Sequence, residues 1–212
     1  MTTTLAMFPL ELVAFPGEQL SLHIFEQRYQ QLIEDCEEGR ITFGIPTYLN
    51  KRLEYGTEME LLKVVKRYPS GASDIICKGI RVFKLTDFYN RLDDKLYAGA
   101  VVHFLDLVKD GTMDSKQKFT DLLNAFYTEL DIATPDVNVT EITSYSLSHK
   151  MGLTIDQEYE LLQIASEEER YLYLIQHLTT ILPTIRSVNR TKEIIKLNGH
   201  FKNFDPLDFE EY

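Results

Sequence analysis

An early stretch of the chain reads Phe8-Pro-Leu-Glu-Leu-Val-Ala-Phe-Pro-Gly17 and continues, two residues later, as Leu20-Ser-Leu-His-Ile24. The first run is apolar up to Phe15 and indicates a strand that closes in the turn pair Pro16-Gly17. The second run alternates apolar and polar residues with a period of two, which is typical of a half-buried strand. The N-terminal part of the chain is therefore predicted to be β-structure.

After Ile24 the period changes to that of a helix. Apolar residues recur at intervals of three and four positions until Gly39, a residue type that often follows a helix C-terminus. The apolar stripe consists of Phe25, Tyr29, Leu32, Ile33 and Cys36. One amphipathic helix is therefore expected among the strands.

Three further strands are expected after this helix. Residues 58–67 and 75–85 are separated by a turn sequence and predict a hairpin, and residues 97–108 give the last strand. Apolar residues change faces within the second of these strands, which places a bend or bulge at Gly79. Short antiparallel strands avoid open edges by closing into a barrel, so we predict a small pseudo-barrel.

Past Gly111 the pattern becomes helical. Residues 119–130 form one apolar stripe, residues 139–151 a weaker helix, and residues 154–165 a short helix that begins with capping-box spacing. The longest helical stripe runs from Tyr171 to Val188, and Pro183 is expected to kink it. The prediction is an α+β fold, with a mostly antiparallel β pseudo-barrel in residues 1–111, an all-helical bundle in residues 112–198 and a polar tail in residues 199–212.

Charge and composition exclude several classes of protein. The 212 residues carry a net charge of −11, which disfavours binding to nucleic acid or to an anionic membrane by bulk charge. A local cluster of cations on the central hairpin keeps RNA binding open as an alternative. It consists of Lys63, Lys66, Arg67, Lys78, Arg81 and Lys84. No apolar run reaches the length of a membrane span and no signal peptide is evident, so we expect a cytoplasmic protein with Cys36 and Cys77 as reduced, buried thiols.

No motif for catalysis or for a bound cofactor is found. The sequence contains no P-loop, no G-x-S-x-G elbow, no H-E-x-x-H and no pair of C-x-x-C motifs. The five histidines show no metal-ligand spacing with one another or with the two cysteines. Paired carboxylates such as Glu37-Glu38 are explained by exposed helix faces, and those of residues 167–169 by a helix N-terminus. We therefore expect no catalytic residue, no metal and no cofactor.

The order of these features resembles the N-terminal domain of the ATP-dependent Lon proteases. The shared segments are Phe8–Gly17, Leu20-Ser-Leu-His-Ile-Phe-Glu-Gln-Arg-Tyr29, Phe43-Gly-Ile45, Tyr55-Gly-Thr57, Gly79-Ile-Arg-Val-Phe83 and Glu160-Leu-Leu-Gln163 with the following run to Leu174. Together they cover about residues 5–190. The motif residues that we interpret as structural are Phe15, Pro16, Gly17, Glu26, Arg28, Tyr29, Gly44, Gly79 and Arg81.

This resemblance implies a barrel like that of RNA-binding PUA domains, followed by a helical subdomain. It also implies recognition of polypeptide, with unfolded chains or a dedicated protein as the partner. The ATPase and protease motifs of the family are not found, so we expect a binding or adaptor protein similar to stand-alone bacterial relatives, without peptidase activity. The oligomeric state stays open. An apolar groove for polypeptide needs exposed aromatic residues, and the candidates in the loops are Tyr48, Tyr55, Tyr68, Phe88 and Tyr89.

Overall fold

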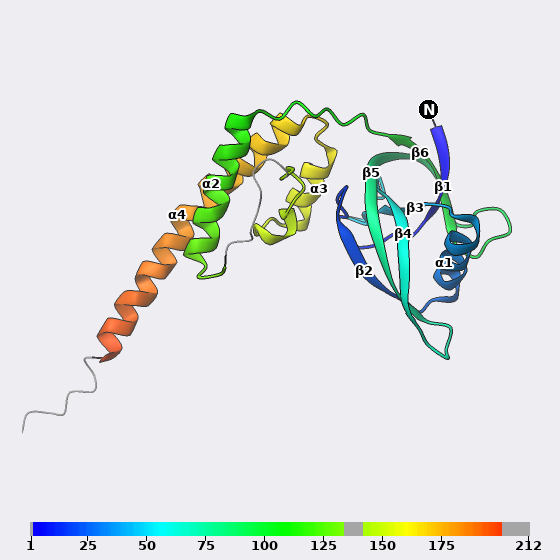
Figure 1. The fold of residues 1–212 in the computed structure, drawn as a ribbon, viewed down its shortest axis with the longest axis horizontal. Helices are drawn as coiled ribbons and strands as arrows, with labels where there is room; N and C mark the ends of the chain where they lie inside the picture. Colours follow the sequence, from blue (N-terminus) through cyan, green and yellow to red (C-terminus); the bar gives the residue numbers. More distant parts are fainter. Residues whose placement is uncertain (1, 134–141, 201–212) are drawn as a thin grey trace, which may run out of the picture.

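A computed structural model describes residues 2–133 and 142–200. Figure 1 shows a closed β-sheet on one side of the molecule and a group of helices on the other, joined by the chain that follows the last strand. The predicted α+β fold, with the strands before the helical bundle, is confirmed. The exact division at residues 111 and 112 stays a prediction.

Six strands form the sheet, in the order β2-β5-β4-β3-β1-β6, and a further pairing of β5 with β6 closes it. All pairings are antiparallel except that of β1 with β3. Closure depends on the length of β5, because its first half pairs with β2 and its second half with β6. The strands are β1 (Thr2–Met7), β2 (Gln19–Ile24), β3 (Phe43–Pro46), β4 (Tyr55–Arg67), β5 (Ser73–Tyr89) and β6 (Ala98–Phe104).

Gly79 is the position where β5 bends, as predicted. The register between β4 and β5 steps from Arg81 to Gly79, which leaves Ile80 as the extra residue of a bulge. The turn after Phe15 docks here, since the Gly17 N–H donates to the Gly79 carbonyl at 2.8 Å and the Gly79 N–H donates to the Glu18 carbonyl at 2.9 Å. A β-carbon on Gly79 would collide with the carbonyl oxygen of Phe15.

Helix α1 (Gln27–Gly39) is inserted between β2 and β3 and covers one opening of the barrel. Its buried residues are Tyr29, Leu32, Ile33 and Cys36, which confirms four of the five residues of the predicted stripe. Phe25 is the exception. It precedes the helix and its side chain is 67% exposed, because the helix begins only after Glu26.

The strand predicted for Phe8–Phe15 is wrong. This segment is irregular, although its backbone follows the sheet for a short distance, with the Phe8 N–H donating to the Gly44 carbonyl at 2.8 Å. Val13, Ala14 and Phe15 are buried in this irregular conformation, so the apolar run reflects burial and not strand pairing. The true first strand is Thr2–Met7, which begins with three exposed threonines.

Three α-helices follow the barrel: α2 (Met113–Glu129), α3 (Ile155–Gln163) and α4 (Glu167–His200). The capping box at Thr154 and Gln157 is present as predicted. Helix α4 continues through Pro183. In the predicted helix 139–151, residues 142–143 are irregular, residues 144–147 form turns and only Ser148–Lys150 form a short 3-10 helix, while residues 139–141 lie outside the described residues.

The helices enclose a second hydrophobic core, which extends to Phe15 and Val82 of the barrel side. The predicted tail, residues 199–212, lies outside the described residues from Phe201 onward. Among the described residues, no helix is both long and apolar enough to span a bilayer.

Candidate functional site

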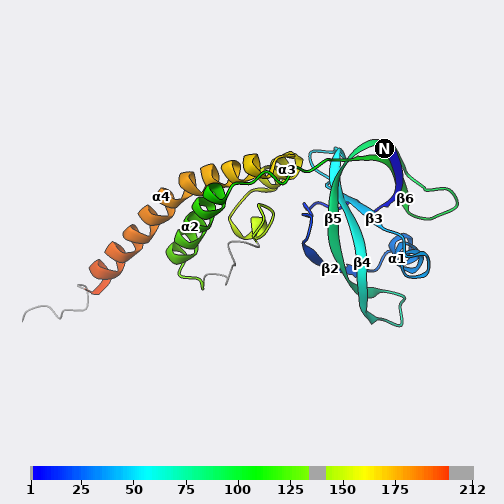
Figure 2. The ribbon, with the colours of Figure 1, turned by 45° about the horizontal axis from the view of Figure 1, so that its top comes forward.

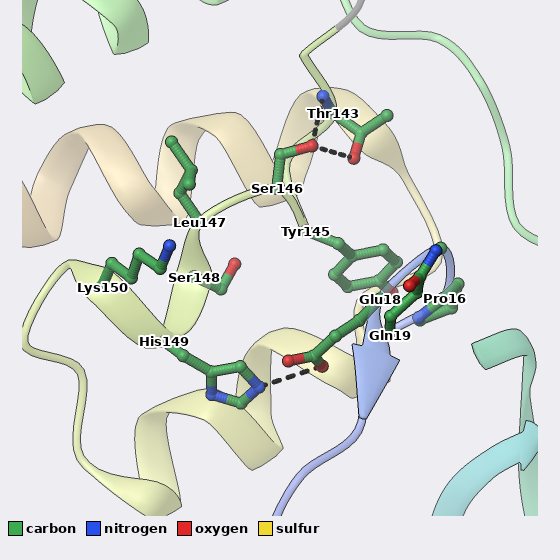
Figure 3. Close-up of a pocket in the computed structure, with 11 residues that line it drawn as sticks. Pro16, Glu18, Gln19, Thr143, Tyr145, Ser146, Leu147, Ser148, His149 and Lys150 are labelled. Carbon is green, nitrogen blue, oxygen red and sulfur yellow. Dashed lines mark hydrogen bonds and ion pairs between the residues drawn. The ribbon is translucent and has the colours of Figure 1, made fainter. Parts of the chain in front are cut away.

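A cleft of about 460 Å³ lies between the turn that precedes β2 and the segment that precedes α3. Its barrel wall is Pro16–Gln19, and its helical wall is formed by residues 143 and 145–150, which come from the other half of the sequence. Figure 3 shows both walls, with Tyr145 and His149 reaching toward the side chain of Glu18. The cleft is therefore built where the two parts of the fold meet.

His149 is held between two carboxylates from different elements. Its Nδ1 lies 2.7 Å from Glu158 Oε1 on α3, and its Nε2 lies 3.1 Å from Glu18 Oε2 of the barrel turn. The hydrogen bonds to Glu158 and Glu18 raise the pKa of His149 to about 9. At neutral pH the ring is therefore an imidazolium that joins the helices to the barrel. Glu18 Oε2 also accepts from the Phe15 N–H at 3.0 Å, which fixes the turn.

An aromatic contact supports the same junction. The rings of Phe15 and Tyr145 stack with their centroids 5.1 Å apart, and the ring of His149 lies 4.9 Å from that of Phe15. The guanidinium of Arg170 lies 4.5 Å from the centroid of the Tyr145 ring on the helical side. Because Phe15 and Tyr145 are both buried, this contact excludes water from the base of the junction.

Arg170 fixes the helical wall of the cleft from behind. Its side chain is 2% exposed, and it pairs with Glu167 while its Nε donates to Ser144 Oγ at 2.7 Å. Glu167 in turn accepts from the Ser144 N–H at 2.8 Å. Burial raises the pKa of Glu167, but the hydrogen bonds from Arg170 and Ser144 outweigh it and the net pKa is lowered. These bonds hold Ser144, and with it the segment that carries Tyr145 and His149, on the N-terminus of α4.

Leu147 lines the cleft in a backbone conformation that is rare for a side chain of its size. Its φ is 66° and its ψ is 9°, in the left-handed region. Such strain persists only where the surroundings enforce it, and it is concentrated at functional sites. The strained residue and the cleft coincide in this structure.

The five aromatic residues predicted from the sequence are not brought together. Tyr55 contacts α3, where its N–H donates to the Tyr159 hydroxyl at 3.1 Å. Tyr48 is 40% exposed and immediately precedes Leu49 and Asn50, which line another cleft, of about 430 Å³, against α3. These two tyrosines therefore lie near the junction.

The other three aromatic residues lie elsewhere. Tyr68 follows β4 at its far end from Tyr55, and its hydroxyl donates to Asp74 Oδ2 at 2.7 Å. Phe88 and Tyr89 are exposed at the C-terminal end of β5. A single groove containing all five does not exist in the described part of the chain. The assignment of each of them to binding stays a prediction.

The motif residues have contacts typical of a structural role. Phe15, Pro16, Gly17 and Gly79 form the barrel side of the junction described above. Arg28 binds Glu26 through Nη2 at 2.8 Å and lies over the Tyr29 ring, which packs on Phe8. Arg81 Nε donates to the buried Glu58 at 2.5 Å, and Gly44 leaves room for Met7 and Phe83.

The described residues give no indication of a metal site or a redox site. No group of three metal-ligating side chains occurs in residues 2–133 or 142–200. Cys36 and Cys77 are free and buried, and burial raises the pKa of each thiol to about 12. The expected burial of both thiols is confirmed, and their reduced state stays a prediction.

Sequence reasoning missed His149, Glu18 and Arg170 as site residues. Arg170 lies in the segment shared with the Lon family, and its position directly after three glutamates is the local signal for an ion pair. His149 and Glu18 are separated by 131 positions, so no local pattern relates them.

The fold defines the class of domain: a closed six-stranded sheet with an inserted helix, followed by a helical bundle, with a cleft between the two. Residues 4–180 match the family described as the ATP-dependent protease La (LON) substrate-binding domain, and the chain belongs to this family. No curated protein sequence matches it.

Two solved structures show the same fold. A Lon N-terminal domain protein from Xanthomonas campestris is 23% identical, with a TM-score of 0.64, over 82% of this chain and 98% of that one. The N-terminal domain of the Mycobacterium avium complex Lon protease is 15% identical, with a TM-score of 0.62, over 84% and 98% of the two chains.

Proposed function

We propose that this protein binds segments of unfolded polypeptide and does not alter them covalently. The observation that carries the proposal is the match of residues 4–180 to a substrate-binding domain family, combined with a cleft at the junction of barrel and helices. Clefts between subdomains are the usual place for ligands. The groups that face this cleft suit a polypeptide, since backbone, hydroxyl and amide groups alternate with the apolar Pro16 and Leu147.

The absence of a catalytic role is part of the proposal. His149 is a charged imidazolium bound on both nitrogens, so it has no free nitrogen to act as a general base at neutral pH. Ser144 and Ser148 are buried in hydrogen bonds within their own wall. We therefore expect an unfolded substrate to stay intact on incubation, with or without ATP.

Binding can be tested with fluorescein-labelled, reduced and carboxymethylated α-lactalbumin, which stays unfolded. We expect its fluorescence anisotropy to rise with added protein, and native α-lactalbumin to give no change. Lys150 is exposed on the cleft rim, so Lys150→Trp should fill the cleft and weaken binding several-fold. Lys109→Trp makes the same substitution at an exposed residue outside the cleft and should leave binding unchanged. Equal binding by native and unfolded probe would contradict the proposal.

RNA binding through the hairpin cations is the weaker alternative. Arg81 is paired with Glu58 and Arg67 with Glu37, so these two charges are compensated. Lys66 and Lys84 lie over the rings of Tyr68 and Tyr55. A labelled single-stranded RNA at low salt tests this alternative, and we expect no change in its anisotropy. Salt-sensitive retention of the RNA would favour the alternative over polypeptide binding.

A further inference from the structure

Several strands have an edge without a partner strand among the described residues, and the two longest of these edges belong to β2 and to the second half of β4. β2 lies at one end of the strand order and pairs only with β5. β4 pairs with β5 along most of its length but with β3 only over Gly56–Met59, so residues 60–67 have a free second edge. An unpaired edge presents backbone N–H and C=O groups that another chain can bind.

The free edge of β4 carries the features by which proteins block strand addition. Its pairing register with β5 is interrupted between Leu61 and Lys63 and again between Val64 and Lys66, so two bulges lie close together in the strand. Lys63, Lys66 and Arg67 place positive charge along it. Arg67 also binds Glu37 of α1 across this edge. Bulges and edge cations oppose pairing with a further strand.

The edge of β2 carries none of these features. Its six residues pair with β5 in one uninterrupted register, from Gln19 with Lys78 to Ile24 with Ser73. Its sequence, Gln19-Leu-Ser-Leu-His-Ile24, contains no proline, lysine or arginine. Antiparallel pairing uses the backbone groups of alternate residues, so about three of the six direct their N–H and C=O groups to the free side.

The position of β2 connects this edge to the cleft. Gln19 is both the first residue of β2 and part of the cleft wall. Figures 1 and 2 show β2 on the side of the barrel that is turned toward the helices, and Figure 3 shows the strand starting beside Tyr145 and His149. A strand added to β2 therefore has one end directed into the cleft.

We propose that the free edge of β2 binds an extended polypeptide segment as an additional strand, with one end of that segment in the cleft. This inference rests on the proposed function and names its mode of recognition. Main-chain hydrogen bonds supply affinity that does not depend on sequence. Leu20 and Leu22 are half-buried on the core side, so segments that alternate apolar and polar residues are preferred, because their apolar side chains extend this layer.

The test uses a labelled nonapeptide that alternates valine and threonine between terminal lysines. Two further versions carry N-methyl groups, one on the valines and one on the threonines. All three have the same side chains, but N-methylation removes the N–H groups along one edge of the peptide. We expect one methylated version to bind at least about tenfold more weakly than the unmethylated peptide. Hydrogen–deuterium exchange of the protein should slow in residues 19–24 and stay unchanged in residues 60–67.

Several results would overturn the inference. Equal affinity for all three peptides would show that backbone pairing does not contribute. Protection of residues 60–67 in place of residues 19–24 would show that the peptide binds the edge of β4 and not that of β2. Concentration-dependent protection of residues 19–24 without peptide, together with dimerisation in sedimentation velocity, would mean that a second copy occupies the edge. Failure of the nonapeptide while carboxymethylated α-lactalbumin binds overturns this inference alone, whereas failure of both overturns the proposed function.

Discussion

His149 makes the contact between barrel and helices depend on charge. Its folded pKa of about 9 lies above its ordinary value of 6.5, so folding favours the protonated ring. The stabilisation is fully present below pH 6.5 and is lost as the pH rises through about 9. Because the side chain is about one third exposed, solvent screening reduces the stabilisation to about 1–2 kcal/mol.

We predict that His149→Gln lowers the free energy of unfolding by about 1–2 kcal/mol at pH 6 and by much less above pH 9.5. Urea unfolding followed by circular dichroism at both pH values measures the difference. His103→Gln, at an exposed position of β6, is the matched control and should change stability little at either pH. A loss for His149→Gln that is independent of pH would show that packing, and not charge, is responsible.

Arg170 is the residue whose loss should cost most. Arg170→Ala leaves the Glu167 carboxylate buried without its cation, which costs about 3–5 kcal/mol. Arg170→Met together with Glu167→Gln removes both charges and should recover a large part of that loss. Guanidinium unfolding of the unchanged protein, of Arg170→Ala and of the double variant ranks their free energies of unfolding. A double variant no more stable than Arg170→Ala would contradict the charge argument.

At the level of single residues, sequence patterns predict which side chains are buried better than they predict which residues contact each other. The stripe of α1 and the bend at Gly79 were predicted because each depends on neighbours within a few positions. The pairing of His149 with Glu18 depends on how two halves of the chain dock, and no periodicity contains that information. The aromatic candidates show the same limit, since exposure of Tyr48 or Tyr89 was foreseeable but their separation in space was not.

Among the elements, the contact of β5 with the turn at Pro16–Gly17 leaves no room for a side chain at Gly79. We predict that Gly79→Ala lowers the free energy of unfolding by about 2–4 kcal/mol, because the new methyl group displaces the carbonyl of Phe15. Gly39→Ala, at the end of α1, should be neutral or slightly stabilising, since its methyl group meets only Ile41 at 3.4 Å. Thermal unfolding compares the two. Equal melting temperatures for the two variants would contradict the close contact of Gly79 with the carbonyl of Phe15.

The elements that sequence patterns missed have a common physical cause. Phe8–Phe15 is as apolar as a strand, but its buried residues pack in two hydrophobic cores without joining a regular strand pairing. Thr2–Met7 pairs with β6 along its whole length, yet its three exposed threonines give no apolar alternation. Residues 144–151 form turns and one 3-10 turn in place of an α-helix, and Arg170 and Glu167 hold this segment through Ser144. Tertiary contacts, which local patterns do not encode, decide all three.

For the whole molecule, the junction predicts cooperative unfolding. The barrel and helices share the Phe15–Tyr145 stack, and the Glu167 N–H donates to the Val108 carbonyl at 3.0 Å. Circular dichroism at 222 nm reports mainly the helices, whereas labelling of Cys36 and Cys77 reports the barrel, where both thiols are buried. We predict coincident urea midpoints for the two probes. Midpoints that differ by more than about 0.5 M would show that the barrel unfolds independently.

The length of α4 has a mechanical consequence. Its 34 residues correspond to about 50 Å at 1.5 Å per residue, and its first turn lies at the junction with the barrel. Asn189 donates to the Glu129 carbonyl at the end of α2 at 2.6 Å, and α4 continues beyond it to His200. A rigid helix of this length amplifies a small change of direction at its first turn. A tilt of only ten degrees at Glu167 moves the far end by roughly 9 Å.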